Sequence, residues 1–126
     1  SMKKEGILSG EWSNSNTCIN VNLSIISFED SGCIVHYCPA LEVYGYGKTE
    51  TEAESSLYTS MSEFFQHTLN KKTFFTELER LGWTMKKTKK MTPPTMLQLL
   101  ANNDNFSNVF NNFPFKKFDQ KIAMPC

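Results

Sequence analysis

The chain has 126 residues with 13 basic and 13 acidic side chains, so its formal net charge at neutral pH is zero. Hydrophobic residues make up 40% and charged residues 21% of the sequence, an average composition that excludes wholesale disorder. The length fits one compact domain, the neutral balance gives no overall field toward nucleic acid or membrane, and no apolar run is long enough to span a bilayer.

A β-hairpin is predicted after an irregular opening segment. Residues 1–16 are polar and patternless, and we expect them to be loosely held. In residues 18–28 apolar and polar side chains alternate, which is typical of a strand with one buried face. Residues 29–32 (Glu-Asp-Ser-Gly) are a turn signal, and residues 33–37 read as the returning strand.

A third strand follows a break at Pro39. Residues 42–48 contain alternating tyrosines and glycines, with Gly45 and Gly47 inside the strand pattern. Glycine within a strand indicates either a bulge or the close approach of another backbone. The sequence leaves these two readings open.

Two helices are predicted next. Thr49 and Glu52 fit a capping box at the start of an amphipathic helix over residues 49–70, whose early glutamates also suit the helix dipole. A shorter helix over residues 73–81 carries its apolar residues on one face. Gly82 is well placed to end this helix in a left-handed conformation.

The remaining third of the chain is less regular. Residues 83–85 alternate as a short fourth strand, and the prolines at 93–94 can open a short helix with apolar residues at 96–100. The asparagine-rich segment 102–112 predicts a loop. Residues 113–126 hold spaced apolar side chains and predict an extended arm, which we expect to pack on its own domain or on a second copy.

These elements predict an α+β fold in the order β-β-β-α-α-β, with a small antiparallel or mixed sheet, helices on one face and a C-terminal extension. The expected division is a flexible segment 1–16, an α+β domain 17–90, and a short helix with an extended arm over 91–126.

The charges are divided between the two parts of the chain. Residues 1–70 carry three lysines against nine acidic residues, a net charge of −6, whereas residues 71–126 carry ten basic against four acidic residues, a net charge of +6. Such a division indicates either two surfaces with different partners or an incidental distribution.

Catalytic and metal-binding residues are scarce. His36 and Cys38 share one face of the predicted strand while Cys33 points to the other, which gives too few ligands for zinc and a weak case for a Cys–His nucleophile. His67 is explained by the end of the helix dipole. We therefore expect no enzyme activity, no metal and no cofactor. The four cysteines, with no signal peptide in view, predict reduced thiols in the cytoplasm.

Nucleic acid and protein are the two partner classes that the sequence offers. A lysine run could contact phosphates, helped by the aromatic side chains of the C-terminal arm, or could simply be a solvated strand end; its members are Lys86, Lys87, Lys89 and Lys90. Tyr44 and Tyr46 alternate on the third strand within the acidic part, where they serve either as protein contacts or as half-buried core residues.

Residues 38–53 resemble the signature of the HicB-type antitoxin family. In that family a hairpin leads to a Pro-x-Leu segment, a strand ending in Gly-x-Thr, and a helix that opens with acidic residues and Glu-Ala. The matching positions are Pro39, Leu41, Gly47, Thr49, Glu52 and Ala53. The resemblance covers roughly residues 18–87. Many members have Pro-Gly-Cys after Pro-x-Leu, where this chain has Glu42-Val43-Tyr44.

The resemblance implies a partial RNase H-type β-β-β-α-β fold without catalysis, in the antitoxin half of a type II toxin–antitoxin pair. Its expected partner is a small basic HicA-like mRNA-cleaving toxin, whose active site it covers. The expected contact residues are Glu42, Tyr44, Tyr46, Glu50 and Glu54. Many members also bind operator DNA through a C-terminal segment, although residues 88–126 do not look like one. We also expect a homodimer or higher homo-oligomer and no membrane association.

Overall fold

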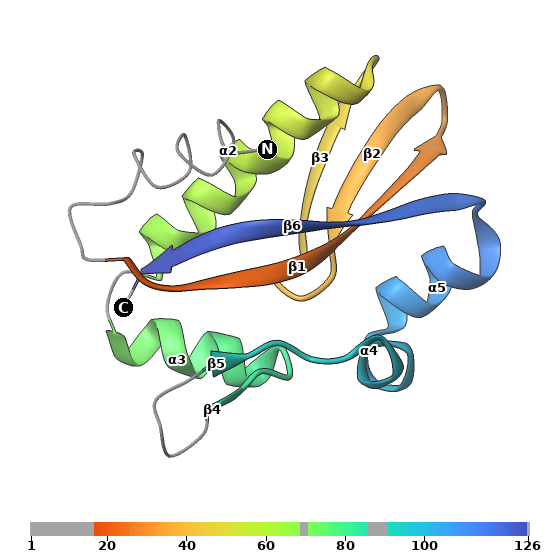
Figure 1. The fold of residues 1–126 in the computed structure, drawn as a ribbon. Coiled ribbons are helices and arrows are strands. Elements are labelled where there is room, and N and C mark those ends of the chain that lie inside the picture. The colour runs from red at the N-terminus through yellow and green to blue at the C-terminus, as the bar shows by residue number, and fades with distance from the viewer. Residues whose placement is uncertain (1–16, 69–70, 86–90, 126) are drawn as a thin grey trace.

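A computed structural model of the chain describes residues 17–68, 71–85 and 91–125 (Figure 1). The fold is α+β, as predicted. The strands are β1 (Thr17–Asp30), β2 (Cys33–Cys38), β3 (Val43–Gly47), β4 (Thr84–Met85), β5 (Met91–Thr92) and β6 (Phe115–Pro125). The helices are α2 (Glu50–His67), α3 (Lys71–Arg80), α4 (Met96–Asn102) and α5 (Asp104–Asn112). The predicted segment 1–16 lies outside the described residues.

The main sheet is antiparallel with strand order β3-β2-β1-β6. The hairpin β1–β2 turns through Ser31 (φ 54°) and Gly32 (φ 81°), and Asp30 pairs with Cys33 across the turn. Two positive φ angles in a two-residue loop match the twist of antiparallel strands. The turn predicted at 29–32 is therefore confirmed, and it fixes which residues of β1 and β2 lie opposite each other.

Helix α2 lies directly on β3 because two glycines leave room for its backbone. A Cβ atom on Gly45 would lie 2.2 Å from the backbone nitrogen of Leu57, and one on Gly47 would lie 2.6 Å from that of Ala53. The close approach of another backbone, one of the two readings of these glycines, is confirmed. At the start of α2, Thr49 accepts a hydrogen bond from the Glu52 N–H, as predicted, but the Glu52 carboxylate accepts from the Lys48 N–H and not from that of Thr49, so the predicted capping box is only half formed.

Two serines of α2 also bond the outer edge of β3. The Tyr46 N–H donates to Ser56 Oγ at 3.0 Å, and Ser60 Oγ donates to the Tyr44 carbonyl at 2.7 Å. Open backbone groups on an edge strand otherwise attract additional strands. The helix thus occupies groups through which β3 could pair with another chain.

Helix α3 ends at the glycine that the sequence singled out. Gly82 has φ 98°, and its N–H donates to the Glu79 carbonyl, while the Trp83 N–H donates to the Leu78 carbonyl at 2.9 Å. This pair of hydrogen bonds is a Schellman motif. The Trp83 ring then enters the core, where its Nε1–H donates to the Ala40 carbonyl at 2.8 Å.

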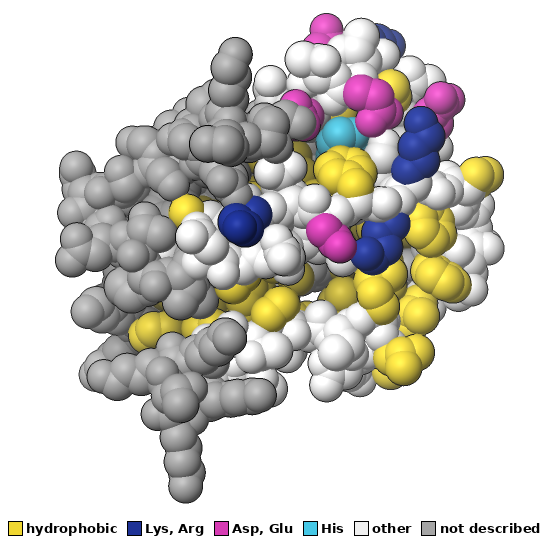
Figure 2. All heavy atoms as spheres, in the orientation of Figure 1, with side chains coloured by type: hydrophobic (Ala, Val, Ile, Leu, Met, Phe, Trp, Pro, Cys, Tyr) yellow, Lys and Arg dark blue, Asp and Glu magenta, His cyan; other side chains and the backbone are white. Residues whose placement is uncertain are grey.

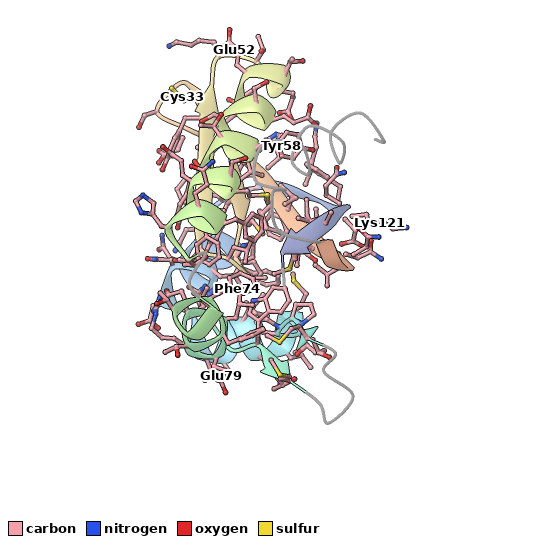
Figure 3. All side chains as sticks on the ribbon, turned by 90° about the vertical axis from the view of Figure 1, so that its left-hand side faces the viewer. Cys33, Glu52, Tyr58, Phe74, Glu79 and Lys121 are labelled. Carbon is pink, nitrogen blue, oxygen red and sulfur yellow. The ribbon has the colours of Figure 1, made fainter. Side chains whose placement is uncertain are left out.

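Helices cover both faces of the sheet rather than the one face that was expected. Alternate residues of β1 project to opposite sides: Leu23 and Ile25 pack with α2 and α3, whereas Ile26 and Phe28 pack with α4 and α5. In the side view of Figure 3, Phe74 of α3 lies in the interior and Lys121 of β6 lies on the outer side. The sheet is therefore a middle layer at its Ile26–Phe28 end, whereas Asn20, Asn22 and Lys121 are exposed further along the same face.

The segment expected to be a loop at 102–112 is mostly helix α5. Asn103 caps this helix by accepting a hydrogen bond from the Phe106 N–H, and Phe106 and Val109 are buried against the sheet. Asparagine is a poor helix former, so the composition favoured a loop. Burial of two apolar side chains three residues apart outweighs that preference. Helix α4 was predicted, but it begins after Thr95 rather than at the prolines.

The C-terminal arm is the edge strand β6, which pairs with β1 from Phe115 opposite Phe28 to Pro125 opposite Thr17. Of the two expectations, packing on its own domain is what the structure shows. The predicted strand at 83–85 pairs instead with β5 in a separate two-stranded sheet. One core contains Leu57, Met91 and Ile122, so it continues across the expected boundary at residue 90.

Candidate functional site

The five residues expected to contact a partner do not form one surface. Glu42, Tyr44 and Tyr46 belong to the side of the sheet that α4 and α5 cover. Glu50 and Glu54 lie in the first turns of α2, on the other side. The five residues are therefore divided between the two faces of the sheet, because successive side chains of β3 point to opposite faces and its tyrosines point away from the helix.

Glu42 has a structural role at the bend between β2 and β3. Its backbone is left-handed (φ 55°), a costly conformation for a residue other than glycine. Its Oε1 accepts hydrogen bonds from Tyr37 Oη at 2.5 Å and Asn103 Nδ2 at 2.8 Å, and its Oε2 accepts one from Asn105 Nδ2 at 2.7 Å. These bonds tie the start of α5 to the bend.

Tyr37 is held as a donor in this cluster. Burial, followed by its hydrogen bond to the Glu42 carboxylate, raises the pKa of the Tyr37 hydroxyl well above its ordinary value. The Tyr37 ring stacks on Tyr44 at 4.3 Å, and the Tyr44 ring faces Tyr46 at 6.2 Å. Tyr46 ends this row of rings and is 57% exposed. Of the two tyrosines expected in an interface, Tyr46 is thus the one available to a partner.

Glu50 is the predicted residue whose setting fits a binding role. It is the first residue of α2, and its Oε1 lies 2.9 Å from His36 Nε2. Ser27 Oγ donates to the same carboxylate, at 3.2 Å from each oxygen. The two supporting side chains are buried, His36 at 3% exposure, while the Glu50 side chain is 55% exposed. Buried side chains therefore hold the Glu50 carboxylate in place, while the carboxylate itself stays accessible to a partner.

Sequence reasoning missed that Ser27 and His36 support Glu50. His36 was assigned no function, and Ser27 was not singled out at all. A two-residue turn at Ser31–Gly32 pairs Asp30 with Cys33, and counting back along the ladder places Ser27 opposite His36. Residues directly opposite in an antiparallel pair share a face. The register of the predicted hairpin is therefore the signal in the sequence that could have identified this pair.

A cavity of about 480 Å³ opens in front of Glu50. Apolar side chains form part of its wall, and polar or charged side chains form the rest. Its lining consists of Ser27, Phe28, Glu29, Glu50, Pro114, Phe115 and Lys116. A second cavity of about 500 Å³ lies beside Glu42, but that carboxylate already accepts three hydrogen bonds from within the chain.

The arrangement of Ser27, His36 and Glu50 differs from a catalytic triad. In a triad the serine hydroxyl donates to the histidine, which a carboxylate orients from its other side. Here the serine hydroxyl donates to the carboxylate, and the histidine bonds the same carboxylate through Nε2. Such a geometry stabilises a negative charge at Glu50 and does not activate the serine.

The hydrogen bond from His36 holds the pKa of Glu50 below its ordinary value of 4.5, and the bond from Ser27 acts in the same direction. A carboxyl whose pKa is lower in the folded chain contributes stability above its unfolded pKa and loses that contribution as pH falls. We expect Glu50→Gln to be destabilising near neutral pH, and this difference should shrink below pH 4.5. Urea unfolding of both proteins from about pH 6 to about pH 3 measures it. A difference that stays constant with pH would contradict the assignment.

The structure gives less support to the residues that the alternative hypothesis assigns to nucleic-acid binding. Lys86, Lys87, Lys89 and Lys90 lie outside the described residues. The aromatic rings of the C-terminal arm have partners within the chain, at centroid distances of 4.9 Å for Phe113–Phe28, 5.4 Å for Phe115–Phe110 and 5.6 Å for Phe118–His36. These contacts agree with the packing role rather than with stacking on bases.

The described part of the chain contains no group of three or more His, Cys, Asp or Glu side chains that could hold a metal ion. Within the same ranges, none of the helices has the length and apolar character needed to cross a membrane. Comparison with protein-family models, with curated proteins and with solved structures found no match to this chain. The geometry around Glu50 is therefore the basis of the functional proposal.

Proposed function

We propose that this chain is a non-catalytic binding protein of the antitoxin type, which neutralises a small basic mRNA-cleaving toxin of the HicA kind. The observation that carries the proposal is the Glu50 carboxylate, which two buried side chains fix while it faces an open cavity. A charged group that is already oriented loses little freedom on binding. Its natural counterpart is a cationic group on a partner.

The surface near the start of α2 has the charge that such a partner needs. Figure 2 shows acidic side chains gathered at the end of the molecule where α2 begins in Figure 1. Glu29 and Asp30 at the end of β1, and Glu50 and Glu52 on α2, are exposed. Complementary charge accelerates the encounter of two proteins and disfavours wrong partners. A ribonuclease that binds RNA through basic side chains would meet this complementarity.

The element order adds support. The segment β1-β2-β3-α2 follows the order that the resemblance to HicB-type antitoxins implies. The strand beside β1 in the sheet is β6 and not the strand after α3, so the sheet is completed differently from that expectation. The cytoplasm is part of the proposal, and among the described residues Cys33 and Cys38 are free thiols. Burial raises the pKa of the Cys38 thiol to about 12, which keeps it unreactive.

The test is neutralisation of a basic ribonuclease encoded beside this gene. We expect the purified chain to bind that protein and to stop its cleavage of RNA at a one-to-one ratio, and Glu50→Gln to weaken the complex about tenfold. Because the contact is electrostatic, affinity should fall as salt rises from about 0.05 M to about 0.5 M. Calorimetry and an RNA cleavage assay measure both effects. Unchanged cleavage in the presence of excess protein would refute the proposal.

Two further partners follow from the same proposal. Since α2 bonds β3 at Tyr44 and Tyr46, the outer edge of β6 is the better place for a second copy to add a strand. Light scattering on the purified chain would show a monomer at all concentrations if no second copy adds a strand at β6.

Operator DNA, or nucleic acid bound through the lysine run at 86–90, is the alternative function. Gel shifts with RNA and DNA across a salt series distinguish it from protein binding.

A further inference from the structure

The cavity in front of Glu50 has one wall suited to an alkyl chain. Pro114 and Phe115 line the cavity where β6 begins, and Phe28, opposite Phe115 on β1, also lines it although its ring packs toward α5 on the other face of the sheet. The polar part of the lining contains two carboxylates, Glu29 and Glu50. A pocket with an apolar wall and an anionic end is complementary to a flexible apolar stem that ends in a positive charge.

The hydrogen bonds already made by Glu50 decide which cation fits. Oε1 accepts a hydrogen bond from His36 Nε2. The Ser27 hydroxyl donates a bifurcated hydrogen bond to both Oε1 and Oε2. Each carboxylate oxygen accepts about two hydrogen bonds. Among the described donors, Oε2 is therefore less occupied than Oε1 and is the oxygen with more room for a further donor. A guanidinium binds a carboxylate best through two parallel bonds to both oxygens, whereas an ammonium needs a single point of contact.

We propose that this cavity binds one lysine side chain of the partner protein, with the ammonium between Glu50 and Glu29 and the methylene stem against Phe115 and Pro114. This inference rests on the proposed function for the partner being a basic protein. His36 and Ser27 are positioning residues in it, because their hydrogen bonds hold the Glu50 carboxylate in place. The cavity volume of about 480 Å³ leaves space for such a side chain.

The chain also supplies a competing charge. Lys116 lies directly opposite Ser27 in the β1–β6 ladder and lines the same cavity. Its positive charge acts on Glu50 in the free protein. Lys116 repels an incoming ammonium and competes with it for Glu50. Removal of the Lys116 charge should therefore strengthen binding rather than weaken it. If the surface attracted cations only through its total charge, removing the Lys116 charge would change binding much less, and removing a lysine elsewhere would have the same effect.

The experiment is an NMR titration of the full chain with Nα-acetyl-lysine methylamide at constant ionic strength. We expect shifts in the amide signals of Ser27, Phe28 and Phe115. Glu50→Gln should weaken binding about tenfold, and Lys116→Gln should tighten it about twofold. Glu63→Gln is the matched control, because it removes the same charge about 20 Å further along α2 and should change affinity little. The norleucine analogue, which keeps the stem without the charge, should bind at least about fivefold more weakly than the lysine probe. The arginine analogue should bind about threefold more weakly than the lysine probe.

Equal binding by the lysine and norleucine probes, equal losses in Glu50→Gln and Glu63→Gln, or weaker binding by Lys116→Gln would each overturn the inference. The unfolding midpoint of every variant is recorded, and Lys116→Gln keeps the test decisive if Glu50→Gln folds poorly. The two proposals fail separately. Probe binding without neutralisation of a ribonuclease refutes the proposed function alone, whereas neutralisation that is unaffected by Glu50→Gln refutes the lysine pocket alone.

Discussion

Replacing Gly45 with alanine is expected to destabilise the fold by about 3 kcal/mol or more, enough to leave a large fraction of the protein unfolded. The added Cβ would lie 2.2 Å from the Leu57 nitrogen and 2.4 Å from the Ala53 carbonyl oxygen. Both atoms belong to the backbone of α2, so no side chain can rotate to relieve the clash. The helix would have to separate from β3, and Ser56 and Ser60 would lose their bonds to the strand.

Gly32→Ala is the matched control for this prediction. Nothing lies within 4 Å of a Cβ atom at Gly32, but its φ of 81° is unfavourable for alanine. We expect a cost of about 1 kcal/mol from that conformation alone. Urea denaturation followed by circular dichroism compares the two variants. Similar losses in both would mean that α2 does not depend on the bare backbone at Gly45.

Phe106→Ala is expected to cost about 3–5 kcal/mol, the range for removing a buried aromatic ring. Phe106 is 0% exposed, and its ring lies 6.4 Å from that of Tyr37 and 6.0 Å from that of Phe110. Together with Val109 it fixes α5 on the sheet. Its loss should also disturb the bonds from Asn103 and Asn105 to Glu42, because these residues belong to the start of the same helix.

Leu97→Ala, in the neighbouring helix α4, provides the comparison. Leu97 is 79% exposed, so its truncation should change the free energy of unfolding by less than about 0.5 kcal/mol. Thermal unfolding of both variants measures the difference. A small effect of Phe106→Ala would show that the segment 102–112 behaves as the loop that its composition predicted, and not as part of the packed fold.

Local signals predicted the first part of the fold well. Three features each depend only on residues that are close together in the sequence: the turn at Ser31–Gly32, the cap at Thr49 and the end of α3 at Gly82. Helix α5 and strand β6 depend instead on surfaces about 90 residues earlier in the sequence, namely the face of β1 that holds Phe28 and the outer edge of the same strand. No periodicity within a short segment contains that information.

The candidate site was predicted in part for the same reason. Glu50 was named because it opens a helix in the acidic part of the chain, whereas its support by Ser27 and His36 depends on pairing between strands. The division of the five expected contact residues could have been foreseen. Gly45 and Gly47 alternate with Tyr44 and Tyr46, so a helix that approaches the glycines must leave the tyrosines on the opposite face.

The pairing of β1 with β6 has a consequence for biosynthesis. Residues 17–28 form their ladder with residues 115–125, so this half of the sheet cannot close until residues 115–125 have left the ribosome. Contacts between such distant segments slow folding, because a long loop must close before they form. During translation the first hairpin and α2 can assemble early, while the remaining edge of β1 stays unpaired until β6 has been synthesised.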